Sequence, residues 1–285
     1  MIPRVLLGGS VVSIVCLVCT ICLYTYLKSK YLDKLKILMQ LMIALLLKSI
    51  LWIVIVGPEI SSKIRDYRRW GWTCNFVISA HFYTQLVAIC WALVLGHYLL
   101  GRLNSVQSCI EFLKLRYMSF CWGIPGLIIS LWATMMALSN DTICWEYHSK
   151  SRYFWIITTP MLAAFGAELF YLVNIIRTII RRYQNVQTRN ELLRIQKAKR
   201  DVGIFSIFAG FNNVLLLCNP WGEANESYRI FQAFFQSIQG GIIALLCCFT
   251  YYRTLLKKLN RPDLSRRPES FLVQFQQNFM TERNI

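Results

Sequence analysis

The sequence predicts an all-α fold: a bundle of seven transmembrane helices followed by a short amphipathic eighth helix. The first observation is composition. Of the 285 residues, 56% are apolar and 16% are charged, and the mean hydropathy is +0.44. Such values are typical of membrane proteins. The second is a set of seven apolar runs, each close to the ~20 residues that a helix needs to cross a bilayer. The third is that the basic residues lie between these runs.

The seven apolar runs are the predicted spans. They cover roughly residues 5–27, 35–56, 75–100, 118–138, 153–176, 202–218 and 230–252. The sixth is the shortest, and its apolar character is interrupted at Asn212 and Asn213. The first run is longer than the apolar part of a secretory signal peptide, and no small-residue cleavage site precedes a soluble domain. We therefore expect it to be retained as a span.

The positions of the charges decide what the formal net charge of +17 means. Because the basic residues alternate with apolar runs, they cannot form a nucleic-acid-binding surface, and we expect no nucleic-acid partner. With the N-terminus outside the cell, 22 of the 31 Lys and Arg fall on the cytoplasmic side and eight on the outer side, while Lys48 lies within a span. Basic loops are held in the cytoplasm. The sequence thus predicts a multi-pass plasma-membrane protein with an extracellular N-terminus and a cytoplasmic C-terminus.

Loop features support this topology. Two glycosylation sequons begin at Asn140 and Asn225, and both fall in predicted outer loops. After the seventh span, residues 253–260 place three leucines on one helical face with basic residues opposite, which is typical of a helix lying in the inner interface. We therefore predict a seven-helix domain over residues 1–260, with the eighth helix at 253–260 and a cytoplasmic tail at 261–285.

Most of the eleven cysteines lie within apolar runs, so they do not predict a disulfide scaffold. Cys74, at the outer end of the third span, and Cys144, in the second outer loop, lie on the oxidising side, where we expect them to form a disulfide rather than stay free thiols. Cys16, Cys19 and Cys22 have no His or carboxylate nearby, and we predict no metal site.

Several motifs occur in an order that resembles the class B, or secretin- and adhesion-like, G-protein-coupled receptors. The slime-mould cyclic-AMP receptors share much of the pattern. The matching segments span roughly residues 70–260 and include 91–99, 121–125 with Trp132, 144–145, 155–160, and 237–240 with 248–249. The segment at 121–125 reads C-W-G-I-P, and that at 237–240 reads S-I-Q-G. The resemblance implies a seven-helix receptor that acts on a heterotrimeric G protein in response to an extracellular ligand, which the sequence leaves unknown.

The departures from the family pattern concern its switching mechanism. The family's third-helix Glu is Leu95 here, and its seventh-helix Tyr is Cys247. Its second-helix His and sixth-helix Thr fall at Leu38 and Val202. In the family these four polar groups form an inner lock, so its mechanism does not carry over. The chain begins almost at the first span, which argues against a hormone-binding extracellular domain.

Polar residues at membrane depth predict a ligand site, because a charged group there costs roughly 2.5–3.5 kcal/mol on insertion scales. The resemblance places most of them in the family's central polar network. The predicted cavity residues are Lys48, Gln85, Glu168, Asn212 and Gln239. Either they line a polar cavity that opens to the outside, or Lys48 and Glu168 neutralise each other in a purely structural network.

Basic residues flank the third inner loop, where the family resemblance implies that a G protein binds. They are Arg177, Arg181, Arg182, Lys197, Lys199 and Arg200. Topology and attraction to anionic lipid of the bilayer are the simpler explanation. No catalytic motif appears, so we expect neither enzymatic activity nor a cofactor. The rival functions are a transporter or channel that uses Lys48 and Glu168, and a seven-helix protein that no longer signals.

Overall fold

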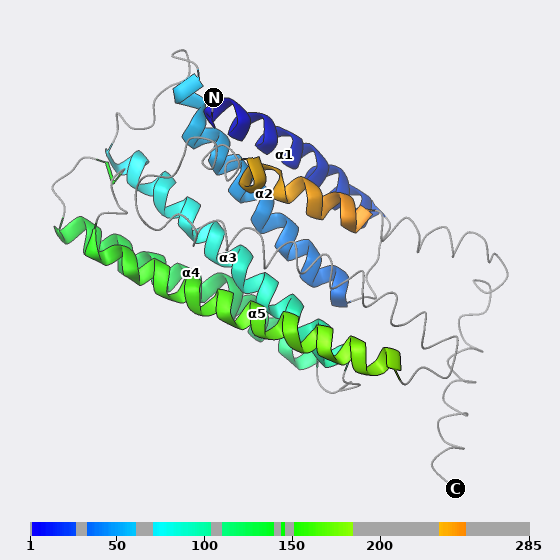
Figure 1. The fold of residues 1–285 in the computed structure, drawn as a ribbon. Helices are drawn as coiled ribbons and strands as arrows, with labels where there is room; N and C mark the ends of the chain where they lie inside the picture. The colour runs from blue at the N-terminus through cyan, green and yellow to red at the C-terminus, as the bar shows by residue number, and fades with distance from the viewer. Residues whose placement is uncertain are drawn as a thin grey trace, which may run out of the picture. The chain divides into compact units, whose positions relative to one another are not determined.

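The computed structural model describes residues 2–26, 33–60, 71–103, 110–139, 144–145, 151–184 and 234–248. Within these ranges the chain is helical and contains no β-strand, which confirms the predicted all-α class. The elements are α1 (Ile2–Tyr26), α2 (Asp33–Ile60), α3 (Gly71–Leu103), α4 (Ile110–Ser139), the short 3₁₀ helix η3 (Arg152–Phe154) and α5 (Trp155–Gln184), shown in Figure 1. A further apolar helix spans Phe234–Cys248.

Five helices in this part of the chain are long and apolar enough to cross a membrane. Their candidate spans are Ile2–Thr25, Lys36–Pro58, Gly71–Gly101, Arg116–Ser139 and Arg152–Arg181. They coincide with the first five predicted spans. The sixth predicted span lies outside the described residues, as does the eighth helix at 253–260. Phe234–Cys248 covers the middle of the seventh predicted span.

The helices are longer than the apolar runs that predict them. α4 begins eight residues before Met118, and α5 continues eight residues beyond Ile176. Hydropathy marks only the part in lipid, whereas the backbone hydrogen bonds continue through the polar residues at each end. Pro58, Pro125 and Pro160 lie inside helices, which membrane helices tolerate when neighbouring groups satisfy the freed carbonyls.

Helix α3 is the centre of the packing. α1 packs on α2, α2 packs on α3, and both α4 and α5 pack on α3. In its most apolar stretch α3 is 61% buried, against 11% for α5. One core cluster joins α3, α4 and α5 around the fully buried Trp132. Another joins Leu6 of α1 to Val56 of α2.

Consecutive helices run in opposite directions, as Figure 1 shows, so the bundle has two distinct ends. We call the end that holds the starts of α1, α3 and α5 the disulfide end, because Cys74 and Cys144 lie there. The other end holds Arg116, Arg177 and Arg181, and we call it the basic end.

The chain divides into two compact units, Met1–Leu245 and Leu246–Ile285. Of the second unit, only Leu246–Cys248 lies in the described ranges. The predicted tail at 261–285 lies outside them.

Candidate functional site

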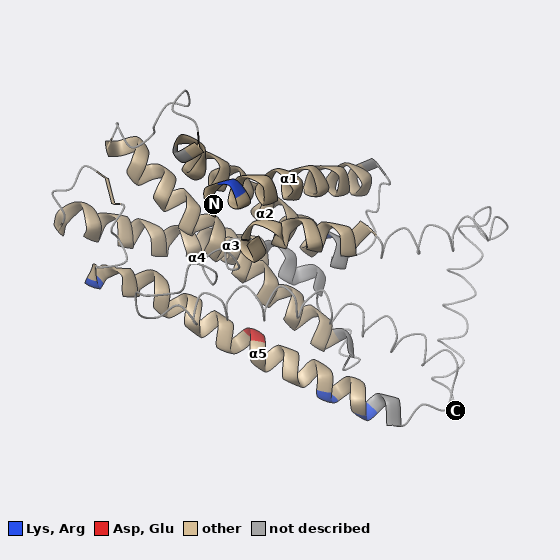
Figure 2. Ribbon diagram, turned by 45° about the horizontal axis from the view of Figure 1, so that its top comes forward, with Lys and Arg blue, Asp and Glu red and all other residues tan. Residues whose placement is uncertain are grey.

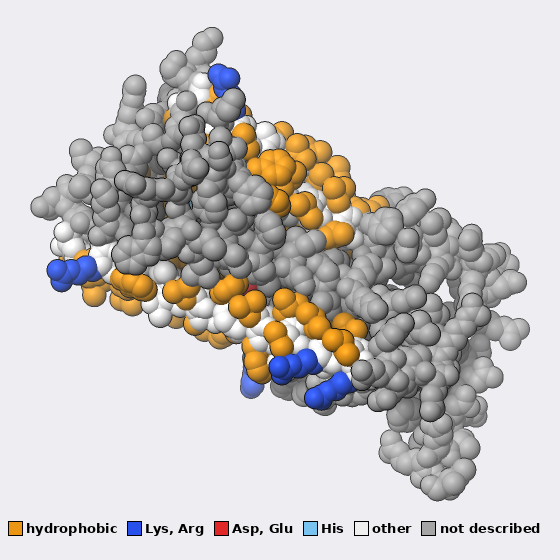
Figure 3. Space-filling view, in the orientation of Figure 1, with side chains coloured by type: hydrophobic (Ala, Val, Ile, Leu, Met, Phe, Trp, Pro, Cys, Tyr) orange, Lys and Arg blue, Asp and Glu red, His pale blue; other side chains and the backbone are white. Residues whose placement is uncertain are grey.

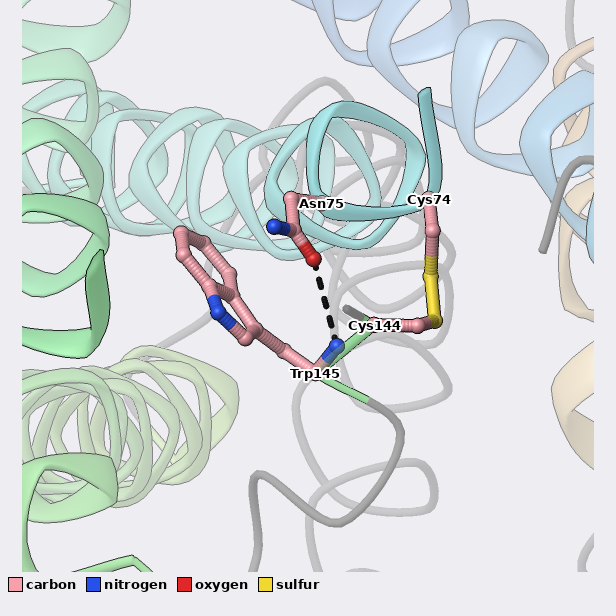
Figure 4. Close-up of a disulfide and its surroundings, with 4 residues drawn as sticks. All are labelled: Cys74, Asn75, Cys144 and Trp145. Atoms are coloured by element: carbon pink, nitrogen blue, oxygen red, sulfur yellow. Dashed lines mark hydrogen bonds between the residues drawn. A yellow bond between two sulfur atoms is a disulfide. The ribbon is translucent and has the colours of Figure 1, made fainter. Parts of the chain in front are cut away.

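The disulfide predicted from the two loop cysteines is present. Cys74 and Cys144 are bonded across 70 residues of sequence, with their Cα atoms 5.6 Å apart. Next to the bond, the Trp145 backbone N–H donates a hydrogen bond to Asn75 Oδ1 at 3.2 Å (Figure 4). The Trp145 ring then packs edge-on against Trp132 at a centroid distance of 5.5 Å. Cys144 and Trp145 are therefore fixed to both α3 and α4.

The Phe234–Cys248 helix, which carries Gln239, is held against α1 by hydrogen bonds to its backbone. Ser13 Oγ donates to the Ser237 carbonyl at 2.6 Å and accepts from the Gly241 N–H at 3.1 Å. Ser237 C=O and Gly241 N–H are one turn apart in the same helix. The Ser13 hydroxyl thus joins α1 to one turn of its neighbour. Thr20 Oγ1 donates to the Ala244 carbonyl at 3.5 Å further along the same contact.

Small residues let these two helices approach closely. A Cβ atom added at Gly9 would collide with the Ser237 side chain, and one added at Gly240 would lie 2.9 Å from Leu17 Cδ1. Small residues four apart, such as Gly9 and Ser13, are the usual means of close packing in membranes. This contact fixes the rotation of the Phe234–Cys248 helix and leaves Gln239 6% exposed. The sequence reasoning missed this contact, although the spacing of Gly9 and Ser13 was a signal for it.

Lys48 of α2 and Gln85 of α3 lie at the same level of the bundle. The rings of Trp52 and His81 are 4.8 Å apart, which fixes the register of these antiparallel helices. Lys48 lies one turn from Trp52, and Gln85 lies one turn from His81, both toward the basic end. The two polar side chains therefore share a level and face each other's helix. They are only 3% and 5% exposed.

Gln239 belongs near this level as well. Ser13 contacts the turn that contains Gln239, and the Leu6–Val56 cluster sets Ser13 close to the level of Lys48 along the α1–α2 contact. We call Lys48, Gln85 and Gln239 the polar layer. Two acceptors in it, Gln85 Oε1 and Gln239 Oε1, are buried and make no hydrogen bond within the described part of the chain. Buried polar atoms without partners are costly, so these two atoms suit a bound polar group.

Glu168 lies nearer the basic end than the polar layer. It is fully buried in α5. The Tyr171 ring lies 6.0 Å from that of His97 on α3, and Glu168 lies close enough to Cys90 to interact with it electrostatically. Both contacts place Glu168 about 7–14 Å along α3 from Gln85. Asn212, the remaining predicted cavity residue, lies outside the described residues.

The positions where the family pattern is broken form a second layer. Leu38 lies 14 residues from Trp52, and Leu95 lies 14 residues from His81, so the same register brings them to one level and to facing sides. They are 3% and 2% exposed. We call this pair the apolar layer. Cys247 is buried, and Val202 lies outside the described residues.

The basic residues at the end of α5 lie on its exposed side. Arg177 and Arg181 are exposed, whereas Ile175 and Ile179, on the opposite side of the helix, are buried. Figure 2 marks these basic positions in blue on the ribbon near the end of α5, and Figure 3 shows blue side chains at that end of the helix. The side chains of Arg182, Lys197, Lys199 and Arg200 lie outside the described part of the structure, as do Asn140 and Asn225.

Comparison with known proteins decides the family. Residues 5–243 match the family described as 7 transmembrane receptor (Secretin family). The chain belongs to the secretin family of seven-transmembrane receptors. The resemblance found in the motifs is thus confirmed, and this secretin-family chain is a multi-pass membrane protein.

Individual relatives agree with the family match. The chain is 26% identical over 181 residues to the secretin receptor of Mus musculus, covering 62% of this chain and 39% of that receptor. It is 25% identical over 248 residues to corticotropin-releasing factor receptor 1 of Macaca mulatta, covering 85% and 58%. It is 29% identical over 184 residues to the vasoactive intestinal polypeptide receptor of Carassius auratus, covering 62% and 40%. The chain thus spans about two fifths of the length of the secretin receptor it matches.

The family's motif residues serve mainly to pack the helices together. In the segment 121–125, the Trp122 carbonyl accepts a hydrogen bond from the Tyr83 hydroxyl at 3.1 Å. Trp132 is fully buried in the cluster with Cys74 and Trp145. Ser237 and Gly240 form the contact with α1. The motifs therefore identify the scaffold, and the polar layer is the candidate site within it.

Proposed function

We propose that this secretin-family chain is a receptor that binds an extracellular ligand at the polar layer and acts on a heterotrimeric G protein at the basic end. In this proposal the disulfide end faces the outside, with Asn140 and Asn225 glycosylated, and the C-terminus is cytoplasmic. The observation that carries the proposal is the burial of Lys48, Gln85 and Gln239 at one level within a receptor-family fold.

The chemistry of the polar layer supports ligand binding. A Lys in the hydrocarbon region costs roughly 2.5–3.5 kcal/mol, and such residues usually mark functional sites. The two amide oxygens without hydrogen bonds add acceptors beside the ammonium group. A ligand that satisfies these groups would bind one arrangement of the helices better than another and shift the population toward it. Asn212 and Glu168 would extend the site from helices six and five.

The G-protein contact is proposed for the third inner loop, whose basic residues include Arg182, Lys197, Lys199 and Arg200. A cytoplasmic helix at 253–260 would complete this side of the receptor domain, which we place at residues 1–260.

A direct test uses cells that express the full chain. Secretin, corticotropin-releasing factor and vasoactive intestinal polypeptide, the hormones named in the matched receptors, would be applied as probes together with a broader peptide library. Cyclic AMP, calcium and nucleotide exchange on G proteins would be measured. We expect a response that Lys48→Leu abolishes at equal surface expression. A response unchanged by Lys48→Leu and by Gln85→Leu would contradict the proposed site.

One observation favours a second candidate, a seven-helix protein that no longer signals. The apolar layer replaces two members of the family's inner lock by Leu38 and Leu95. Such a protein would show no nucleotide exchange with any probe. Exchange in the unaltered chain would reject this candidate.

A further inference from the structure

An exposed surface at the basic end of α3, α4 and α5 combines charge, hydrogen-bond donors and aromatic rings. His97 of α3 is exposed, although it lies where three helices meet. Its ring is 6.5 Å from that of Tyr117 on α4 and 6.0 Å from that of Tyr171 on α5.

Three exposed arginines lie on α4 and α5, next to these aromatic residues or further toward the basic end. Arg116 precedes Tyr117 on α4 and is exposed. Arg177 and Arg181 continue α5 toward its end, one turn apart, and both are exposed on the side away from the buried Ile175 and Ile179. The three guanidinium groups thus point away from the helix core, and the long side chains can reach the membrane interface.

Acidic groups do not balance these arginines among the described side chains. Glu168 is the only acidic residue whose side chain is described, and it is fully buried. Figure 2 marks an acidic position in red on the α5 ribbon. The described side chains of this surface therefore carry net positive charge, with hydroxyl and imidazole groups beside the arginines.

We propose that this surface, formed by His97, Arg116, Tyr117, Tyr171, Arg177 and Arg181, binds the headgroup of an anionic phospholipid of the cytoplasmic leaflet. Basic pockets between helices on the cytoplasmic side are suited to such headgroups. The arginines attract the phosphate, and the His and Tyr groups provide donors that a smooth basic surface lacks.

The acyl chains of the lipid find an apolar wall above the headgroup. Phe120 of α4 is 50% exposed and Phe170 of α5 is 64% exposed. Phe120 lies one turn from Tyr117 on α4, toward the disulfide end. Phe170 adjoins Tyr171 on α5 and lies almost level with it. A lipid with its phosphate at the arginines would therefore place its first methylene groups against these two rings.

The inference rests on the proposed orientation, because only the cytoplasmic leaflet is rich in anionic lipid. The lipid site and the orientation of the chain are therefore tested by separate measurements, so that either can be rejected without the other. In nanodiscs, phosphatidylserine is present in both leaflets, so binding there does not depend on how the chain is inserted in cells. Surface accessibility of an N-terminal tag in intact cells reports the orientation alone.

The experiment uses the full chain in nanodiscs of phosphatidylcholine with or without phosphatidylserine. Retained phosphatidylserine is counted by native mass spectrometry, and its apparent affinity is measured by energy transfer from a labelled lipid. We expect each of Arg116→Gln, Arg177→Gln and Arg181→Gln to weaken binding by about fivefold, since a basic residue near the surface contributes about 1 kcal/mol. The matched control is Arg152→Gln, an exposed arginine at the disulfide end, which should leave binding unchanged.

The variant His97→Leu distinguishes a specific headgroup site from non-specific electrostatic attraction of anionic lipid to the arginines. It removes the imidazole between the two tyrosines and keeps all three arginines. Weaker phosphatidylserine binding in His97→Leu supports the site. Equal binding by His97→Leu and the unaltered chain, or equal losses for Arg152→Gln and Arg177→Gln, would overturn it. A change in nucleotide exchange by Arg177→Gln in purely neutral lipid would instead assign this surface to the G protein, and self-association lost in the same variant would assign it to a second copy of the chain.

Discussion

The interface between α2 and α3 contains two layers of opposite character. At one level Lys48 faces the side of α3 that carries Gln85. About 15 Å away, toward the basic end, Leu38 faces the side that carries Leu95. All four residues are buried, and the contact between Trp52 and His81 sets the register for both layers.

This difference separates two roles that one receptor needs. The polar layer keeps costly groups buried, which is typical of a binding site, whereas the apolar layer makes stable packing that needs no ligand. In the family, a polar lock at the basic end opens on activation. Here Leu38 and Leu95 make that end of the interface apolar. In the proposed receptor, ligand binding at the polar layer would therefore be coupled to the basic end by packing rather than by breaking hydrogen bonds.

The largest effect is expected from a carboxylate placed in the apolar layer. Leu95→Glu buries a charge opposite Leu38 and should destabilise the protein by about 3 kcal/mol, within the insertion cost of a membrane charge. Thermal unfolding in detergent and surface expression would both fall. The matched change in the polar layer is Gln85→Glu, which places the same carboxylate opposite Lys48 and should be tolerated. Equal losses for the two variants would remove the distinction between the layers.

Removing the charge of the polar layer is expected to stabilise the protein, whereas adding a charge to the apolar layer destabilises it. Lys48→Leu relieves the burial of an ammonium group and should raise stability by roughly 2–3 kcal/mol on insertion scales. Any ligand response should disappear in the same variant. Thermal unfolding measured beside nucleotide exchange would check both expectations. A less stable Lys48→Leu protein would indicate that Lys48 is held by a partner and is structural.

The contact that positions Gln239 can be weakened sterically. Gly240→Ala would bring a Cβ to 2.9 Å from Leu17 Cδ1, and overpacking of this kind costs about 1–3 kcal/mol. The control is Gly166→Ala, because a Cβ at Gly166 meets nothing within 4 Å. Thermal unfolding should separate the two variants, and similar values for both would show that α1 and the Phe234–Cys248 helix do not pack closely.

The smallest effect is expected from the hydroxyl between these helices. Ser13→Ala removes two hydrogen bonds to the backbone, and interhelical hydrogen bonds in membranes contribute about 0.6 kcal/mol on average. Ser130→Ala is the control, since Ser130 is exposed on α4. If Ser13→Ala lowered the stability several times more than this average, the hydroxyl would also control the shape of the neighbouring helix.

The sequence predicted the individual helices better than the offsets and pairings between them. Hydropathy located five spans because lipid contact dictates composition directly, and the family motifs pointed to Cys74 and Cys144. The depth of Glu168 relative to Lys48 could not be predicted, since it depends on the offset between α3 and α5, which is set by contacts such as that of His97 with Tyr171. The pairing of Leu38 with Leu95 likewise needed the ring contact of Trp52 with His81.

Helix ends were predicted least well. Arg116 lies in α4 although it precedes the apolar run, because a basic side chain can reach the interface while its backbone stays helical. The contact of Ser13 with Ser237 and Gly241 joins residues more than 220 positions apart, and spacing within either helix alone does not specify its partner.

Cross-linking across the apolar layer tests the register on which both layers depend. Cysteines would be introduced as Leu38→Cys with Leu95→Cys, and, one turn away, as Leu38→Cys with Leu99→Cys. Mild oxidation followed by peptide mapping would identify the bonded pairs. We predict that residue 38 bonds to residue 95 and not to residue 99. Bonding to residue 99 instead would shift α2 by one turn along α3, separate Lys48 from Gln85, and contradict the polar layer.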